Sequence, residues 1–112
     1  MAQAKEIKKV LTRKYGNRDF TGKIPNKRDK LTIHHIFANR FGGKLTLHNS
    51  ALLCRSVHDK FNLIETKFPL IGETLNDDFL EYKQTQNEQI VKDNAYYIKK
   101  YYGRALKKCK KR

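Results

Sequence analysis

The sequence predicts a small α+β domain that is mostly helical and contains a two-stranded hairpin followed by a helix. A chain of 112 residues suffices for one domain with a modest core. Two short runs of β-branched and bulky apolar residues, 31–37 and 50–55, flank a pair of glycines, and apolar residues then recur at helical spacing. We therefore predict one domain over residues 1–112. It has a basic helix and loop (1–30), a hairpin–helix core (31–68) and a helical region with a basic tail (73–112).

The segment before the hairpin predicts one short helix. Residues 2–14 carry Ile7, Val10 and Leu11 at helical spacing, so this face is expected to pack inward. Residues 16–30, which follow, are basic and rich in turn-forming residues, with Gly22 and Pro25 among them.

The two strands are expected to pair through a connection that contains Gly42 and Gly43, residues suited to turns that need a positive φ. The helix after the second strand has a start signal resembling a capping box, because Ser56 is followed three residues later by Asp59. Its apolar stripe ends before Pro69 and consists of Val57, Phe61, Ile64 and Phe68.

The last third of the chain is helical in composition from residue 75 to about residue 102, and residues 84–88 are a possible break. Asn76, Asp77 and Asp78 would place negative charge in its first turn, the favourable end of the helix dipole. The tyrosines of this region, Tyr96, Tyr97, Tyr101 and Tyr102, allow two interpretations. Packing is the commoner role of a stripe at helical spacing, and stacking on nucleic-acid bases is the alternative.

All four histidines lie in the hairpin–helix segment (31–68), and three of them, His34, His35 and His58, form a candidate site. Imidazole is a common metal ligand and, with a pKa near ~6.5, can also accept a proton near neutrality. Along a strand His34 and His35 point to opposite faces, so one can face a metal while the other reaches a water molecule. His58 and Asn62, at i and i+4 of the helix, can converge on one ion. His48 lies outside this pattern and is expected to be solvated.

These residues resemble the HNH endonucleases, whose ββα-metal motif has a His in the first strand, an Asn in the connection and a His on the helix. The likeness covers the central third of the chain and is closest to small stand-alone members from phages or mobile elements. It implies that His34 is a metal ligand, His35 the general base, Asn49 an orienting residue and His58 a second ligand. Asn62 matches a position at which the nuclease colicins place a further ligand.

The resemblance implies hydrolysis of DNA phosphodiester bonds with one divalent ion and products with 5′-phosphate and 3′-hydroxyl ends. Mg²⁺ prefers oxygen ligands, whereas two imidazoles suit Mn²⁺, Ni²⁺ or Zn²⁺. Double-stranded DNA is the expected partner. No apolar stretch approaches the ~20 residues of a membrane span, and the first residues are charged rather than leader-like. We expect the cytoplasm of a bacterium or of a phage-infected cell.

The chain departs from the many HNH domains that hold a structural zinc with two Cys-x-x-Cys pairs. Of those four positions only Cys54 is a cysteine. Because a closed zinc site needs four protein ligands, we predict no structural zinc, with Phe20 and Val57 packing in its place. Cys54 and Cys109 do not form a disulfide framework.

The net charge of +14 is concentrated at the two ends of the chain. Residues 1–33 hold ten Lys and Arg against three acids, residues 34–98 hold seven against eight, and residues 99–112 hold eight against none. Basic ends are expected to contact a polyanion, although a solvated tail is the alternative for the last residues. The candidate phosphate contacts are Arg55, Lys60, Lys107, Lys108, Lys110, Lys111 and Arg112.

Two other functions share this sequence pattern. A non-catalytic nucleic-acid-binding protein would keep the fold and the basic ends, but the intact base position at His35 argues against it. An RNA-directed nuclease or toxin is the second, because backbone charge does not distinguish RNA from DNA.

Overall fold

The computed structural model describes residues 4–37 and 42–110, with the side chain of Lys110 left out. The elements follow one another as α1 (Ala4–Tyr15), β1 (Leu31–His35), β2 (Ser50–Cys54), α2 (Arg55–Lys67), α3 (Pro69–Thr85) and α4 (Glu88–Lys110). The α+β class with a mostly helical chain is therefore confirmed. Both strands are shorter than predicted, by two residues for β1 and one for β2, because pairing ends at His35 and the helix begins directly after Cys54.

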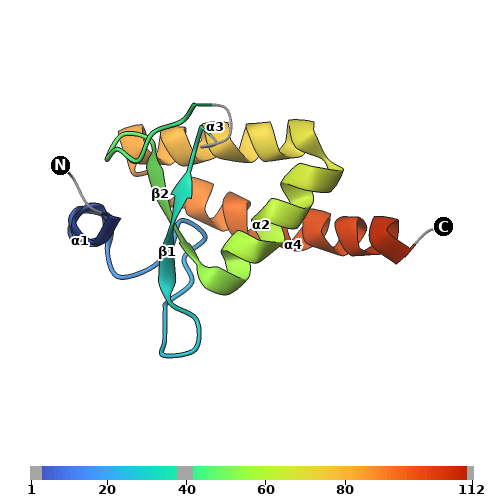
Figure 1. Cartoon of the computed structure of the whole chain (residues 1–112), viewed down its shortest axis with the longest axis horizontal. Coiled ribbons are helices and arrows are strands. Elements are labelled where there is room, and N and C mark those ends of the chain that lie inside the picture. The colour runs from blue at the N-terminus through green and yellow to red at the C-terminus, as the bar shows by residue number, and fades with distance from the viewer. Residues whose placement is uncertain (1–3, 38–41, 111–112) are drawn as a thin grey trace.

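The hairpin lies between α1 on one side and the other three helices on the opposite side (Figure 1). The two strands pair antiparallel, with His34 opposite Ala51 and His35 opposite Ser50. Every residue of β2 is buried, as expected for a strand covered on both faces. The predicted turn is also present, since Gly42 has a φ of +91°.

Phe20, from the loop before the hairpin, is at the centre of the core. Its ring makes edge contacts with Tyr15, Phe79 and Tyr82, with ring centres 5.3, 6.2 and 5.0 Å away. Its backbone N–H donates to the carbonyl of Leu52 at 2.8 Å, which fixes this loop to β2. Phe20 and Val57 are both buried, as predicted, although Phe20 packs against α1 and α3 as well as the hairpin region.

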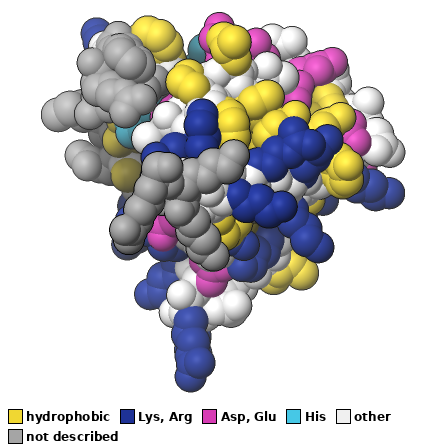
Figure 2. Space-filling model, turned by 90° about the vertical axis from the view of Figure 1, so that its right-hand side faces the viewer, with side chains coloured by type: hydrophobic (Ala, Val, Ile, Leu, Met, Phe, Trp, Pro, Cys, Tyr) yellow, Lys and Arg dark blue, Asp and Glu magenta, His cyan; other side chains and the backbone are white. Residues whose placement is uncertain are grey.

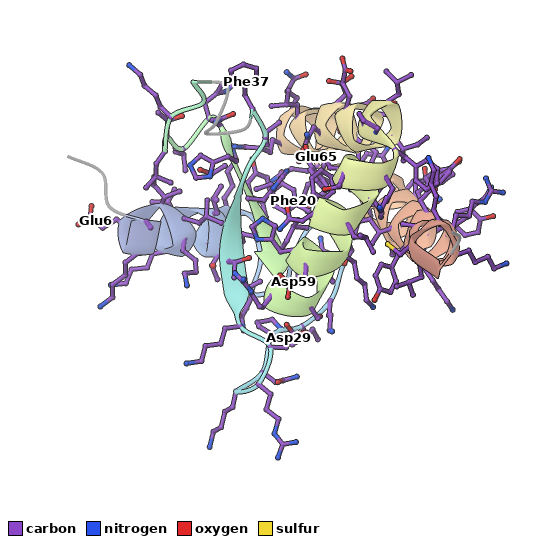
Figure 3. The ribbon with its side chains drawn as sticks, turned by 45° about the vertical axis from the view of Figure 1, so that its right-hand side comes forward. Glu6, Phe20, Asp29, Phe37, Asp59 and Glu65 are labelled. Carbon is purple, nitrogen blue, oxygen red and sulfur yellow. The ribbon has the colours of Figure 1, made fainter. Side chains whose placement is uncertain are left out.

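The prediction of a capping box at Ser56 is wrong. The residue before α2 is Cys54, which makes no side-chain cap, and the helix begins at Arg55. The backbone N–H of Ser56 donates to Asp29 Oδ1 at 2.8 Å, and its hydroxyl donates to Asp29 Oδ2 at 2.5 Å. Asp29 therefore caps the helix from the preceding loop, and Figure 3 shows it beside the first turn of α2. Asp59 instead pairs with Arg55 on the exposed surface at 3.4 Å.

A second buried carboxylate holds the same loop. Asp19 Oδ1 accepts hydrogen bonds from the backbone N–H groups of Thr21 and Lys23 and from the Thr21 hydroxyl, at 2.8, 3.0 and 2.6 Å. Its Oδ2 accepts from the N–H of Cys54 at 2.9 Å. Because an unpaired buried carboxylate would be costly, these bonds fix the loop 19–29 to the point where β2 becomes α2.

The C-terminal half consists of two helices, and the predicted break is confirmed at Gln86, whose φ is +52°. The prediction for Asn76, Asp77 and Asp78 is wrong, because α3 begins at Pro69 and these residues lie in its middle. Proline fits the first turn of a helix, where its missing N–H leaves no bond unmade. Within the described residues, no helix combines the length and the apolar character that crossing a bilayer requires.

We predict that Asp29→Asn lowers the free energy of unfolding at pH 7 by about 1–3 kcal/mol, because hydrogen bonds to a charged acceptor are removed. The Lys23 ammonium and the Ser56 bonds lower the pKa of Asp29 from 3.8 to about 2. This stabilisation is therefore complete above pH 4 and disappears as the pH falls toward 2. Urea unfolding across this range measures it.

The matched control is Asp59→Asn, because the Asp59 carboxylate is 59% exposed in its pair with Arg55. Such surface pairs contribute at most about 1 kcal/mol, so this variant should be close to the parent protein. Equal losses of stability for the two variants would contradict the assignment of Asp29 as the cap of α2.

Candidate functional site

His34 is the buried member of the candidate site. Its ring packs edge-on against Phe61 and Phe79, with ring centres 4.4 and 5.6 Å away. Burial lowers the pKa of His34 to about 4, so the imidazole is neutral at pH 7. Its Nε2 lies 2.7 Å from Asn76 Oδ1. Since that oxygen only accepts, His34 carries its proton on Nε2 and has a lone pair on Nδ1.

His58, on the first turns of α2, is half-buried beside His34, with ring centres 5.2 Å apart. Its Nδ1 lies 2.8 Å from the hydroxyl oxygen of Thr32. That hydroxyl already donates its only proton to the carbonyl of Leu53 at 2.7 Å, so His58 must donate through Nδ1. The lone pair of His58 is therefore on Nε2. Burial and the neighbouring Arg55 lower the pKa of His58, which keeps this ring neutral as well.

His35 ends β1 and is half-buried. The positive charge of a protonated His35 lowers the pKa of both His34 and His58, so the three imidazoles are electrostatic neighbours. No side-chain hydrogen bond joins His35 to another of the residues that the structure describes.

Asn49 holds the chain immediately after His35. Its Oδ1 accepts from the N–H of Phe37 at 2.7 Å, and its Nδ2 donates to the carbonyls of Phe37 and Lys44, both at 3.0 Å. These bonds join the two ends of the connection between the strands, one of which is marked by Phe37 in Figure 3. They extend the hairpin beyond His35 and restrict the backbone that carries the proposed base.

The remaining candidate residues differ in whether they face the histidine group. Asn62 is exposed one turn after His58, on the same side of α2. Arg55 is close enough to His58 to influence its pKa. Lys60, two residues from His58, points to the other side of the helix, where its ammonium lies 5.3 Å from the Tyr102 ring centre. His48 is exposed outside the group, as predicted.

The basic tail is only partly described. Lys107 and Lys108 are exposed on the last turns of α4, and the Lys108 ammonium donates to the carbonyl of Lys67 at 3.3 Å. The side chain of Lys110, together with Lys111 and Arg112, lies outside the described residues.

Three residues that hold the site were missed from the sequence. Asn76 is on α3, 42 residues from the histidine it binds, and no local pattern reveals it. Thr32 had a usable signal, because it lies two residues before His34 and so on the same face of the strand. The ammonium of Lys83 donates to the carbonyls of Leu47, His48 and Ser50 at 2.6, 2.9 and 2.7 Å and fixes the start of β2 to α3.

The donor set fits one catalytic divalent ion held by few protein ligands. Two neighbouring neutral imidazoles, each with its other nitrogen occupied by a hydrogen bond, are the arrangement expected of metal-binding histidines. The described part of the chain contains no group of three or more His, Cys, Asp or Glu suited to one ion. Water, with or without the Asn62 amide, would therefore complete the coordination.

The same test fails for a structural zinc. Burial raises the pKa of Cys54 to about 12, and the other cysteine, Cys109, is exposed on α4, so one thiol is available here where a closed site needs four ligands. The carboxylates nearest to it, of Asp19 and Asp29, are occupied by the hydrogen bonds that hold the loop. These residues do not make a closed zinc site.

One of the comparisons with known proteins found a family for this segment. The family model for HNH endonuclease matches residues 19–62, which run from the buried carboxylate of Asp19 through the hairpin to Asn62 on α2. Neither the search of curated proteins nor the search of solved structures gave a match. HNH nucleases are hydrolases that act on nucleic acids and generally use a divalent metal ion. The segment from residue 19 to residue 62 therefore matches the HNH endonuclease family.

Proposed function

We propose that this protein is a metal-dependent endonuclease that hydrolyses phosphodiester bonds of double-stranded DNA. The observation that carries the proposal is the pair of neighbouring neutral imidazoles, His34 and His58, whose free lone pairs are fixed by Asn76 and Thr32. A scaffold that only bound DNA would not need this set of protonation states.

In the proposed reaction His34 and His58 would hold the divalent ion. His35 would take a proton from the water that attacks phosphorus, and the bond from phosphorus to the 3′ oxygen would break. A bound divalent ion supplies positive charge that stabilises the phosphate and the leaving oxygen. Two imidazoles favour Mn²⁺, Ni²⁺ or Zn²⁺ over Mg²⁺. Asn49 holds the backbone next to His35, so it is a positioning residue. Arg55, beside His58, is the nearest candidate to meet the phosphate.

Replacing His35 with Ala should lower cleavage of a supercoiled plasmid by about 10²–10⁴-fold, the usual contribution of a general base. Metal binding and the thermal melt should change little, because His35 makes no side-chain hydrogen bond within the described chain. His48→Ala is the control and should cleave normally. Full activity of His35→Ala would remove this residue from the mechanism, and preferential digestion of an RNA of matched length would overturn the choice of DNA.

Thr32→Val should weaken Mn²⁺ binding by about 10- to 100-fold, because a residue that orients a ligand histidine typically contributes this much. Valine keeps the size and branching of threonine but leaves His58 Nδ1 without its acceptor. Calorimetric titration measures the affinity. The control is Thr66→Val, because the Thr66 hydroxyl only donates to a carbonyl within α2, at 2.9 Å. Unchanged affinity in Thr32→Val, or equal reductions in both variants, would contradict the role of His58 as a ligand.

A further inference from the structure

The outer face of α4 presents aromatic and basic side chains that take no part in the candidate site around His34 and His58. Tyr96 and Tyr97 are 60% and 40% exposed, unusually much for large rings on one turn of helix. The sequence contains no acidic residue from Asn94 to its end. Figure 2, which views the molecule from the side where α4 ends, shows Lys and Arg side chains with hydrophobic ones between them.

Four rings on this face form a continuous aromatic row, composed of Tyr96, Tyr97, Tyr101 and Phe68. The ring centres of Tyr96 and Tyr97 are 5.2 Å apart, and Tyr97 stacks on Tyr101 at 6.5 Å. Phe68, from the junction of α2 and α3, meets Tyr101 edge-on at 6.1 Å. Each neighbour supports the next, so the rings are held in place before any ligand arrives.

Three cations lie along the aromatic row. The Lys100 ammonium is 5.8 Å from the Tyr96 ring centre and 5.6 Å from that of Tyr101. The Arg104 guanidinium is 5.3 Å from Tyr101, and the Lys108 ammonium is 4.9 Å from Phe68. Cation–π contacts of this kind hold positive charge at the ring faces. Aromatic faces and positive charge therefore alternate along one surface.

We propose that the aromatic row binds an unpaired strand of nucleic acid, with bases stacked on Tyr96 and Tyr97 and phosphates next to Lys100, Arg104 and Lys108. This binding mode rests on the proposed function for its nucleic-acid substrate. In a duplex the faces of the bases are covered by their neighbours, so only an unpaired strand can use exposed rings. The cations attract the phosphates of duplex and unpaired strands alike. The exposed rings favour the unpaired strand.

The aromatic row lies near the candidate site, because α2 contacts α4. α2 carries His58 on one side, and on the other side Lys60 lies over Tyr102 of α4. α2 thus lies between the proposed metal ligands and α4, the helix that carries three of the four rings of the aromatic row. A substrate with a junction between duplex and unpaired strand would meet both surfaces. A second copy of this face is a poor occupant, because self-association would bring the three cations close to the same three cations of the other copy, and like charges repel.

Fluorescence anisotropy of the full chain in EDTA tests this, because cleavage is then absent and binding alone is measured. The probes are a labelled oligo(dT) and a duplex of equal length. Tyr96→Ala/Tyr97→Ala should weaken oligo(dT) binding, since each stacked base contributes about 5- to 150-fold. Duplex affinity should change less than about twofold, because the charges remain. Tyr96→Phe/Tyr97→Phe keeps both rings and should bind as the parent chain does.

Lys100→Gln/Arg104→Gln should weaken binding of both probes, and the salt dependence of oligo(dT) binding should become shallower by about 0.7 for each phosphate that is no longer neutralised. Unchanged oligo(dT) affinity in the Ala pair, or equal reductions on oligo(dT) and duplex, would overturn the proposal. So would a reduction confined to binding of anionic phospholipid vesicles, which would identify a membrane surface instead. If the parent chain binds oligo(dT) through the rings yet cleaves no plasmid with Mn²⁺, the proposed function fails and the single-strand surface stands.

Discussion

The pair of carboxylates that fixes the start of α2 is the interaction on which the rest of the site depends. No residue separates β2 from α2, so the direction of the helix is set where Cys54 ends the strand. Asp19 binds the N–H of Cys54 and Asp29 binds the N–H of Ser56, both from one loop. His58 follows Ser56 by two residues, which is about half a turn of helix. A change in the helix direction would move it away from Thr32 and His34, so the carboxylates determine whether the imidazoles meet.

In HNH domains with two Cys-x-x-Cys pairs, a structural zinc ion holds the corresponding region. In this chain a loop with two aspartates and a buried aromatic ring, Phe20, occupies that role. Hydrogen bonds to a carboxylate are individually weaker than zinc coordination, but burial strengthens them and core packing adds to them. The lowered pKa of Asp29 makes the stability of this domain depend on pH in the acid range.

The sequence was sufficient for the hairpin, for α2 and for the break between α3 and α4, because each is encoded by local periodicity or turn residues. It was also sufficient for the approach of His34 to His58, since strand alternation and helical spacing place these two rings. The sequence-based prediction was wrong at the start of α2. There Asp29, from the loop before the hairpin, accepts the hydrogen bonds of Ser56, and the predicted capping box of Ser56 and Asp59 does not form. The sequence-based prediction also failed at Asn76, because a contact across 42 residues leaves no local signal. The protonation states of the histidines follow only from such contacts.

The fold presents two neutral imidazoles, those of His34 and His58, and hydrogen bonds fix which nitrogen of each carries the lone pair. Long-range ¹H–¹⁵N NMR of the histidine rings near neutral pH, before and after addition of Zn²⁺ as a diamagnetic probe, measures these protonation states. We expect the free protein to carry the proton on Nδ1 of His58 and on Nε2 of His34. Zinc should then shift His58 Nε2 and His34 Nδ1 and leave His48 unchanged. A His58 ring protonated on Nε2, or a zinc-dependent shift at His48 alone, would contradict these assignments.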